Sequence, residues 1–214
     1  MFDLLLKTAL AYLIGNLMGG ALIGLLRGGV DLRKQGSGNV GATNALRTQG
    51  AKFALGVLAI DVAKGVLAAR LVPLLGPFGT PLLDGATQAY LCGVAVALGH
   101  CYPLFYGFRG GKGVATLAGV FGALLGPALL WMLAVFVLIV LLSGYVSLAT
   151  LGACLTAIVW TALAPAGLHS ATGAFTLAMA LLVVWKHRDN IRRLLAGSES
   201  RFEKARVLGR WLRR

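Results

Sequence analysis

Residues 99–116 read GHCYPLFYGFRGGKGVAT, and this glycine-rich stretch lies between two long apolar runs. Its glycines let backbone N–H groups approach an anion closely, and Arg109 and Lys112 supply positive charge. A helix expected from about Gly113 would point the positive end of its dipole at the same place. The stretch therefore predicts an anion-binding loop at the surface of a membrane.

The composition indicates a membrane protein. Hydrophobic residues make up 58% and charged residues 13% of the 214 positions. The mean hydropathy of +0.82 is too high for a water-soluble domain of this length. The first apolar run, roughly 3–26, exceeds the apolar region of a cleavable signal peptide, so we expect it to span the bilayer.

The charge is strongly positive, with twenty Lys and Arg against seven Asp and Glu. Half of the basic residues follow Trp185, and a basic tail beside apolar spans predicts contact with anionic lipid headgroups rather than nucleic acid. Cys92, Cys101 and Cys154 are odd in number and scattered through apolar runs, which argues against a disulfide framework and a zinc site.

Seven spans are expected from the apolar runs, provided that the run 113–142 breaks at Gly126-Pro127. Seven spans place the loops 27–51 and 107–112 and the tail on one side, which the positive-inside rule makes cytoplasmic. The N-terminus is then outside and the C-terminus inside, whereas six spans would put the basic tail outside. The expected spans are 3–26, 52–74, 86–106, 113–125, 128–144, 146–164 and 168–186.

The fold class predicted is all-α and polytopic, with residues 1–186 as a single seven-helix transmembrane domain. Residues 187–214 would form a basic cytoplasmic tail, either an amphipathic helix on the headgroups or a solvated, frayed segment. Small-xxx-small spacing predicts close helix packing on the first and fourth spans, at Gly15, Gly19, Gly20, Gly24, Gly122 and Gly126.

Three polar clusters fall on the inferred cytoplasmic side. The first, 36–44, reads GSGNVGATN and is followed by Arg47, which combines permissive glycines with neutral donors and a guanidinium that can grip phosphate. The second is the loop with Arg109 and Lys112, which lacks the spacing of a nucleotide P-loop. The third, 186–193, reads KHRDNIRR and contains His187.

Other polar residues are ambiguous. Asp61 and Lys64 lie three apart within the second span, where they either support the fold as a neutral pair or orient a site residue. His100 and His169 are expected to be packing or surface residues. No His, Cys, Asp or Glu residues have the spacing of a metal site, so no metal is expected.

Together the motifs SGNVGATN (37–44), GH…GFRGGKGVAT (99–116) and HRDN (187–190) resemble those of the bacterial acyl-phosphate:glycerol-3-phosphate acyltransferases, the PlsY family. The segment DVAKG (61–65) resembles the family as well, and the likeness covers nearly the whole chain. Two departures are Arg109, where lysine is commoner, and Ser143-Gly144-Tyr145, where a basic residue before the tyrosine is usual.

The resemblance implies a seven-span enzyme of the bacterial inner membrane that acts in phospholipid biosynthesis, with its active site facing the cytoplasm. It would move a fatty acyl group from acyl phosphate to the 1-hydroxyl of sn-glycerol 3-phosphate, giving lysophosphatidic acid and phosphate. It implies no metal, no cofactor and no acyl-CoA, and no obligate protein partner is evident.

The resemblance also implies the site. His187, Lys112, Asn190 and Ser37 would be catalytic. The substrate-binding residues would be Gly38, Asn39, Thr43, Asn44, Arg47, Arg109, Gly110, Gly111 and Ser147. His187 either removes the hydroxyl proton or positions the substrate by donating a hydrogen bond; the sequence leaves both roles open.

Two other classes fit less well. A transporter of a phosphate compound would need a polar path to the outer face, yet the linkers 75–85 and 165–167 contain no Lys or Arg and are nearly featureless. A structural or lipid-binding membrane subunit would explain the basic tail but not the donors in the loops.

Overall fold

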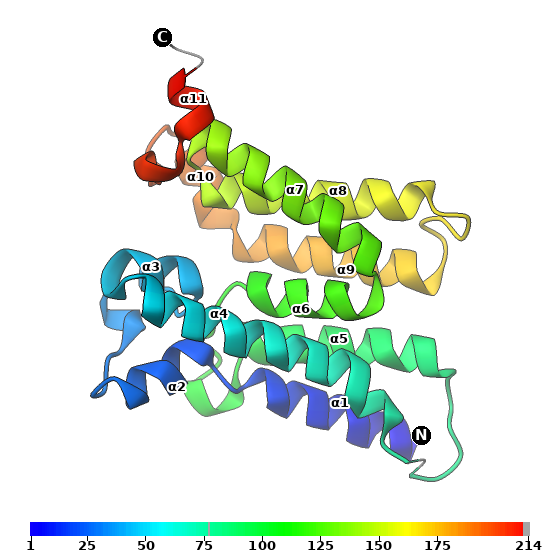
Figure 1. The fold of residues 1–214 in the computed structure, drawn as a ribbon. Helices are drawn as coiled ribbons and strands as arrows, with labels where there is room; N and C mark the ends of the chain where they lie inside the picture. The colour runs from blue at the N-terminus through cyan, green and yellow to red at the C-terminus, as the bar shows by residue number, and fades with distance from the viewer. Residues whose placement is uncertain (77, 212–214) are drawn as a thin grey trace. The chain divides into compact units, whose positions relative to one another are not determined.

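The computed structural model describes residues 1–76 and 78–211, and within them every regular element is helical, which confirms the all-α class (Figure 1). Leu212, Arg213 and Arg214 of the predicted tail lie outside the described residues. The chain divides into two compact units, Met1–Leu125 and Gly126–Arg214.

Unit 1 consists of α1 (Phe2–Gly15), α2 (Gly19–Leu26), α3 (Ala42–Gln49), α4 (Ala51–Val66), α5 (Gly85–Cys101) and α6 (Val114–Leu124). Short turns of other helix types link them at Leu32–Lys34 (η1), Leu67–Leu71 (η2), Val72–Leu74 (η3) and Leu104–Tyr106 (η4). Helix α5 begins where the Asp84 carboxylate accepts hydrogen bonds from the N–H groups of Ala86 and Thr87, at 2.9 and 3.0 Å.

The apolar run 3–26 is two helices rather than one, because α1 and α2 meet at an angle of 46°. A break leaves backbone groups without helical partners, and here a buried ion pair on α4 satisfies them. The Lys64 ammonium donates to the carbonyls of Gly15 (3.1 Å) and Leu17 (2.8 Å), and Asp61 accepts from the N–H of Gly19 at 3.3 Å.

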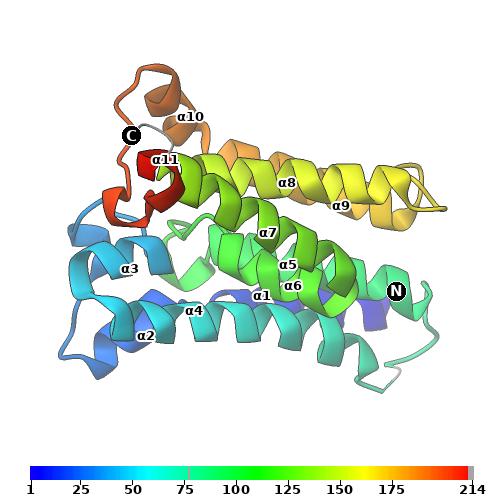
Figure 2. The same cartoon turned by 45° about the horizontal axis from the view of Figure 1, so that its top comes forward.

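Helix α1 packs against α5 and α4 against α6, and α3 also packs on α4. A buried cluster of Leu32, Ala45, Phe53, Ala54 and Val57 holds the loop after α2 onto the start of α4. As Figures 1 and 2 show, the loops 27–41 and 102–113 lie at the same end of unit 1, where α4 begins.

Unit 2 contains α7 (Gly126–Ser143), α8 (Val146–Leu163), α9 (Ala171–Lys186), α10 (Arg188–Leu195), η5 (Glu203–Ala205) and α11 (Val207–Trp211). Helix α8 packs against both α7 and α9, and α11 packs against α7 (Figure 2). Helices α7 and α9 both end where α8 begins. The first residues of α8 therefore lie at the same end of this unit as α10 and α11.

The predicted break in the run 113–142 is confirmed, since α6 ends at Leu124 and α7 begins at Gly126. By length and composition, three helical segments can cross a membrane alone: Gly85–Tyr106, Gly126–Ser143 and Val146–Leu163. A fourth results if α1 and α2 form one bent span, and α6 and α9 are shorter apolar helices. The count of seven spans therefore stays a prediction.

Candidate active site

The predicted site residues divide between the two units. Unit 1 carries those of the 36–47 and 109–112 segments, and unit 2 carries Ser147, His187 and Asn190. Within each unit, the segments that carry these residues lie at one end of the helices (Figures 1 and 2).

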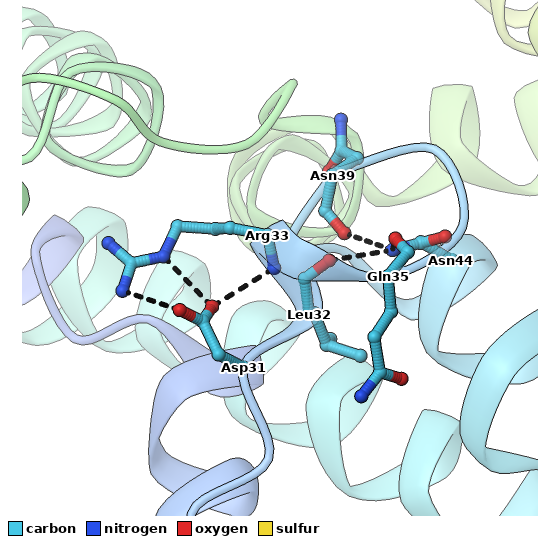
Figure 3. Close-up of polar contacts among 6 residues, drawn as sticks. All are labelled: Asp31, Leu32, Arg33, Gln35, Asn39 and Asn44. Carbon is cyan, nitrogen blue, oxygen red and sulfur yellow. Dashed lines mark hydrogen bonds and ion pairs between the residues drawn. The ribbon is translucent and has the colours of Figure 1, made fainter.

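The side chain of Asn44 organises the first glycine-rich loop of unit 1 (Figure 3). Its amide nitrogen donates to the carbonyls of Leu32 (3.2 Å), Gln35 (3.0 Å) and Asn39 (2.8 Å), and its oxygen accepts from the Ser37 N–H at 3.0 Å. Asn44 is only 1% exposed, so these bonds form inside the loop. Asn44 therefore shapes the backbone that presents the exposed Ser37, rather than facing solvent itself.

The loop is built around glycine. Gly36 and Gly38 have φ of +54° and +71°, a backbone region that favours glycine, and a Cβ at Gly36 would overlap the Asn44 side chain. The Asn39 side chain accepts a hydrogen bond from the Gly41 N–H at 2.9 Å. Thr43 is half-buried and Arg47 exposed, both on α3.

A cavity of about 280 Å³ opens beside this loop. One wall is the apolar face of α2, with Met18, Ala21 and Leu25, and the rest includes Arg33, Tyr106 and Arg109. The Arg33 guanidinium lies 5.8 Å from the centre of the Tyr106 ring and makes a two-bond contact with Asp31 (2.9 and 3.0 Å, Figure 3). Hydrogen bonds from Arg33 hold the pKa of the Asp31 carboxyl below its ordinary value.

The second glycine loop, Gly110-Gly111-Lys112, sits directly on His100 at the end of α5. The Gly111 N–H donates to the His100 carbonyl at 3.1 Å. A Cβ at Gly110 would overlap that carbonyl, and a Cβ at Gly111 would overlap Nε2 of the His100 ring. The loop can lie this close to α5 only because both positions are glycine, while Arg109 stays exposed and Lys112 half-buried.

Beneath this loop lies a buried network of Asp61, Lys64 and His100. The Lys64 ammonium contacts Asp61 Oδ1 at 2.9 Å and His100 Nδ1 at 2.7 Å, and Asp61 Oδ1 is 3.5 Å from Nδ1. An ammonium only donates, so Nδ1 is the acceptor and the ring proton lies on Nε2, the nitrogen next to Gly111.

In unit 2, Glu199 brings two predicted site residues together. Its Oε1 accepts from the Ser147 hydroxyl at 2.8 Å and the Asn190 amide at 2.6 Å, and its Oε2 accepts from Arg193 at 2.7 Å. Burial raises the pKa of Glu199, but these hydrogen bonds outweigh it, so the pKa lies below its ordinary value.

His187 follows α9 directly and is 3% exposed. Its Nδ1 lies 2.8 Å from the Val183 carbonyl, which can only accept, so Nδ1 carries a proton. In the neutral ring, Nε2 is then the acceptor nitrogen.

Residues 5–197 match the family described as glycerol-3-phosphate acyltransferase, a range that includes all three motifs. The chain belongs to this glycerol-3-phosphate acyltransferase family. A glycerol-3-phosphate acyltransferase of Shewanella oneidensis is 40% identical over 205 residues, covering 94% of each chain. One of Synechococcus sp. strain CC9902 is 42% identical over 197 residues, covering 92% of this chain and 94% of its own.

Solved structures agree with this assignment. The chain is similar to PlsY (YgiH), described as an integral membrane glycerol 3-phosphate acyltransferase. The glycerol 3-phosphate form of PlsY superposes with a TM-score of 0.83 at 38% identity, over 96% of this chain and 98% of PlsY. The lysophosphatidic acid form gives 0.82 at 36% identity over the same shares.

One polar partner of the predicted site residues, Glu199, was not expected from the sequence. Glu199 is one of three acids in the basic segment 186–214, together with Asp189 and Glu203, and no pattern in the sequence marks it out from the other two. His100 was expected to be a packing or surface residue, and the packing role is confirmed, since it is buried and packs against the Gly110–Lys112 loop. In the part of the chain that the structure describes, no three His, Cys, Asp or Glu side chains come together in a way that could hold a metal ion.

Proposed function

We propose that this glycerol-3-phosphate acyltransferase family member transfers a fatty acyl group from acyl phosphate to the 1-hydroxyl of sn-glycerol 3-phosphate. The products would be lysophosphatidic acid and phosphate, as a step in phospholipid biosynthesis. The observation that carries the proposal is the family match over 5–197, which includes the loops around Ser37 and Lys112 and the His187 segment.

The chemistry of the donor fits the residues. An acyl phosphate already has a good leaving group, which needs neutralisation of charge more than protonation. Arg109 and Lys112 lie on a glycine loop that leads into the N-terminus of α6, so cations, N–H groups and the helix dipole act on one place. The cavity beside α2 combines an apolar wall with the Asp31–Arg33 ion pair and Arg109, and Arg109 supplies the positive charge suited to an anion that carries a fatty chain.

Within this proposal the site residues have different tasks. Ser37, Arg47, Lys112, His187 and Asn190 would contact glycerol 3-phosphate or the transferring phosphate. Other predicted residues would act by shaping or lining the site: Gly38, Asn39, Thr43, Asn44, Arg109, Gly110, Gly111 and Ser147. The hydrogen bonds of Asn44 and Ser147 within their own units support a shaping role.

We place the enzyme in the bacterial inner membrane, with seven spans in residues 1–186, the N-terminus outside and the active site facing the cytoplasm. Residues 187–214 would be a basic cytoplasmic tail in contact with anionic headgroups. The support is the distribution of charge: most Lys and Arg residues lie in the loops 27–51 and 107–112 and in the tail, whereas the linkers 75–85 and 165–167 contain none.

A product assay tests the function. Purified protein with synthetic acyl phosphate and glycerol 3-phosphate should release lysophosphatidic acid and phosphate in equal amounts. Acyl-CoA should not replace acyl phosphate, and EDTA should leave the rate unchanged. Efficient turnover of acyl-CoA would place the chain in a different acyltransferase class, and loss on chelation, restored by one divalent ion, would remove the metal-free mechanism.

A further inference from the structure

We propose that Asp61, Lys64 and His100 form a positioning network that holds the Gly110–Lys112 loop in its anion-binding geometry. The inference rests on the proposed function, which makes that loop part of the substrate-binding site. It assigns these three residues no contact with substrate; they act through the backbone of Gly110 and Gly111.

The network is built from charges that are almost fully buried, since the side chains of Asp61 and Lys64 are each 2% exposed and that of His100 is 4% exposed. Buried ion pairs usually contribute little to stability, because well-packed apolar residues often serve as well. The buried charges of this network each contact a separate segment of unit 1, which points to a geometric task.

The network joins segments that are far apart in sequence. Lys64 reaches the carbonyls of Gly15 and Leu17 at the break between α1 and α2, Asp61 receives the N–H of Gly19, and Lys64 also meets His100 on α5. The position and tautomer of the His100 ring are thus fixed by α4, which in turn is tied to the start of α2.

His100 passes this constraint to the loop through two separate contacts. Its carbonyl accepts the Gly111 N–H at 3.1 Å, and its ring lies so close to Gly111 that a Cβ there would overlap Nε2. Lys112 follows directly, so a shift of Gly111 moves the backbone that carries this cation. A misplacement of about 1 Å in a site can cost about 100-fold in rate.

Two glycines that meet different parts of His100 provide a matched test. The added methyl of Gly111→Ala overlaps the His100 ring, whereas that of Gly110→Ala overlaps the His100 carbonyl and the Pro103 ring, which remain in any His100 variant. Neither glycine has a positive φ, so alanine itself is allowed at both positions. The measurement is kcat/KM with acyl phosphate and glycerol 3-phosphate. It is made for the single variants Gly110→Ala, Gly111→Ala and His100→Ala, and for the two double variants that combine His100→Ala with one glycine change.

We expect each single variant to lose at least about tenfold in kcat/KM. The His100→Ala/Gly111→Ala pair should be at least about fivefold more active than the product of its single losses, because truncation of the ring makes room for the methyl. The His100→Ala/Gly110→Ala variant should lose kcat/KM by the product of its two single losses. Multiplied losses in the Gly111 pair, or equal relief in both pairs, would overturn the proposal.

His100→Asn guards against a folding defect, because its amide oxygen can still accept from Lys64 while the ring beneath Gly111 is removed. It should keep a melting temperature near that of the wild type and give the same relief with Gly111→Ala. Hydrogen exchange supplies a readout without activity: amides of 107–113 should exchange faster in His100→Asn, and those of 86–95 should not. Unchanged exchange in 107–113 would contradict the network, whether or not the wild type is active. An inactive wild type would by itself reject only the proposed function.

Discussion

The imidazole of His187 is held at Nδ1 by the main chain, which sets the role that Nε2 can play. With Nδ1 bound to the Val183 carbonyl at 2.8 Å, the neutral ring accepts at Nε2 and can take the proton of the glycerol hydroxyl. Donation to a substrate oxygen from Nε2 would require the charged ring. The contact fits a base if the ring is neutral and a donor if it is charged, and we propose the base role as the one to test.

His187→Gln should therefore lower kcat by at least about 100-fold, the lower range for loss of a general base, and flatten the acid limb of the kcat profile. The measurement is kcat against pH at saturating substrate. His169→Gln is the control, because His169 is exposed in the connection between α8 and α9. A His187→Gln enzyme that kept a tenth of kcat and an unchanged acid limb would show that the ring only positions substrate.

At Glu199 the relevant property is stability as a function of pH. The pKa of Glu199 is lower in the folded than in the unfolded protein, so its ionised form stabilises the fold. This stabilisation is complete above the unfolded pKa of about 4.3 and is lost as the pH falls through the lower folded pKa. Glu199→Gln should unfold at a lower temperature than the wild type at pH 7, and the gap should narrow below about pH 4. Exposed Glu203→Gln is the control; a gap that stayed constant on acidification would rule out this linkage.

Among the helices, α1 and α5 come into backbone contact where Gly15 of α1 meets Gly99 of α5. A Cβ at Gly99 would overlap the Tyr12 carbonyl and lie 3.0 Å from the Gly15 Cα. Such contacts between backbones are typical of helix packing in membranes, where small residues form the interface. The predicted packing role of Gly15 is thus confirmed, with α5 as its partner.

Gly99→Ala should lower stability by about 1–3 kcal/mol, the usual cost of overpacking, because the added methyl meets main-chain atoms that cannot move aside. Thermal unfolding in detergent measures the effect. Gly85→Ala on the same helix is the matched control, because a Cβ at Gly85 meets nothing within 4 Å. Equal melting temperatures for the two variants would mean that the helices separate easily at this crossing.

For the whole molecule, the distribution of charge predicts how the chain crosses the bilayer. In a background without Cys92, Cys101 and Cys154, single cysteines at the exposed positions 38 and 189 should be labelled only from the cytoplasmic side. Single cysteines at the exposed positions 80 and 166, in the two linkers without cations, should be labelled only from outside. Labelling of position 38 or 189 by an impermeant external reagent would reject the seven-span orientation.

The sequence by itself determined the helical class, the approximate bounds of most helices, and the family. Long apolar runs separated by glycine, proline and charge mark helix ends locally, as at Gly126-Pro127. The loop motifs were equally visible, because the glycine loops predicted to bind anions consist of residues that are neighbours in the sequence.

Only the tertiary structure decided what the polar residues between those motifs contact. The bend between α1 and α2 depends on Lys64, 47 residues after Leu17, and the loop at Gly111 rests on a ring whose tautomer that same lysine sets. Ser147 meets Glu199 across 52 residues of sequence. A buried polar group must find a partner wherever the fold brings one, and neither periodicity nor composition specifies which distant residue that will be.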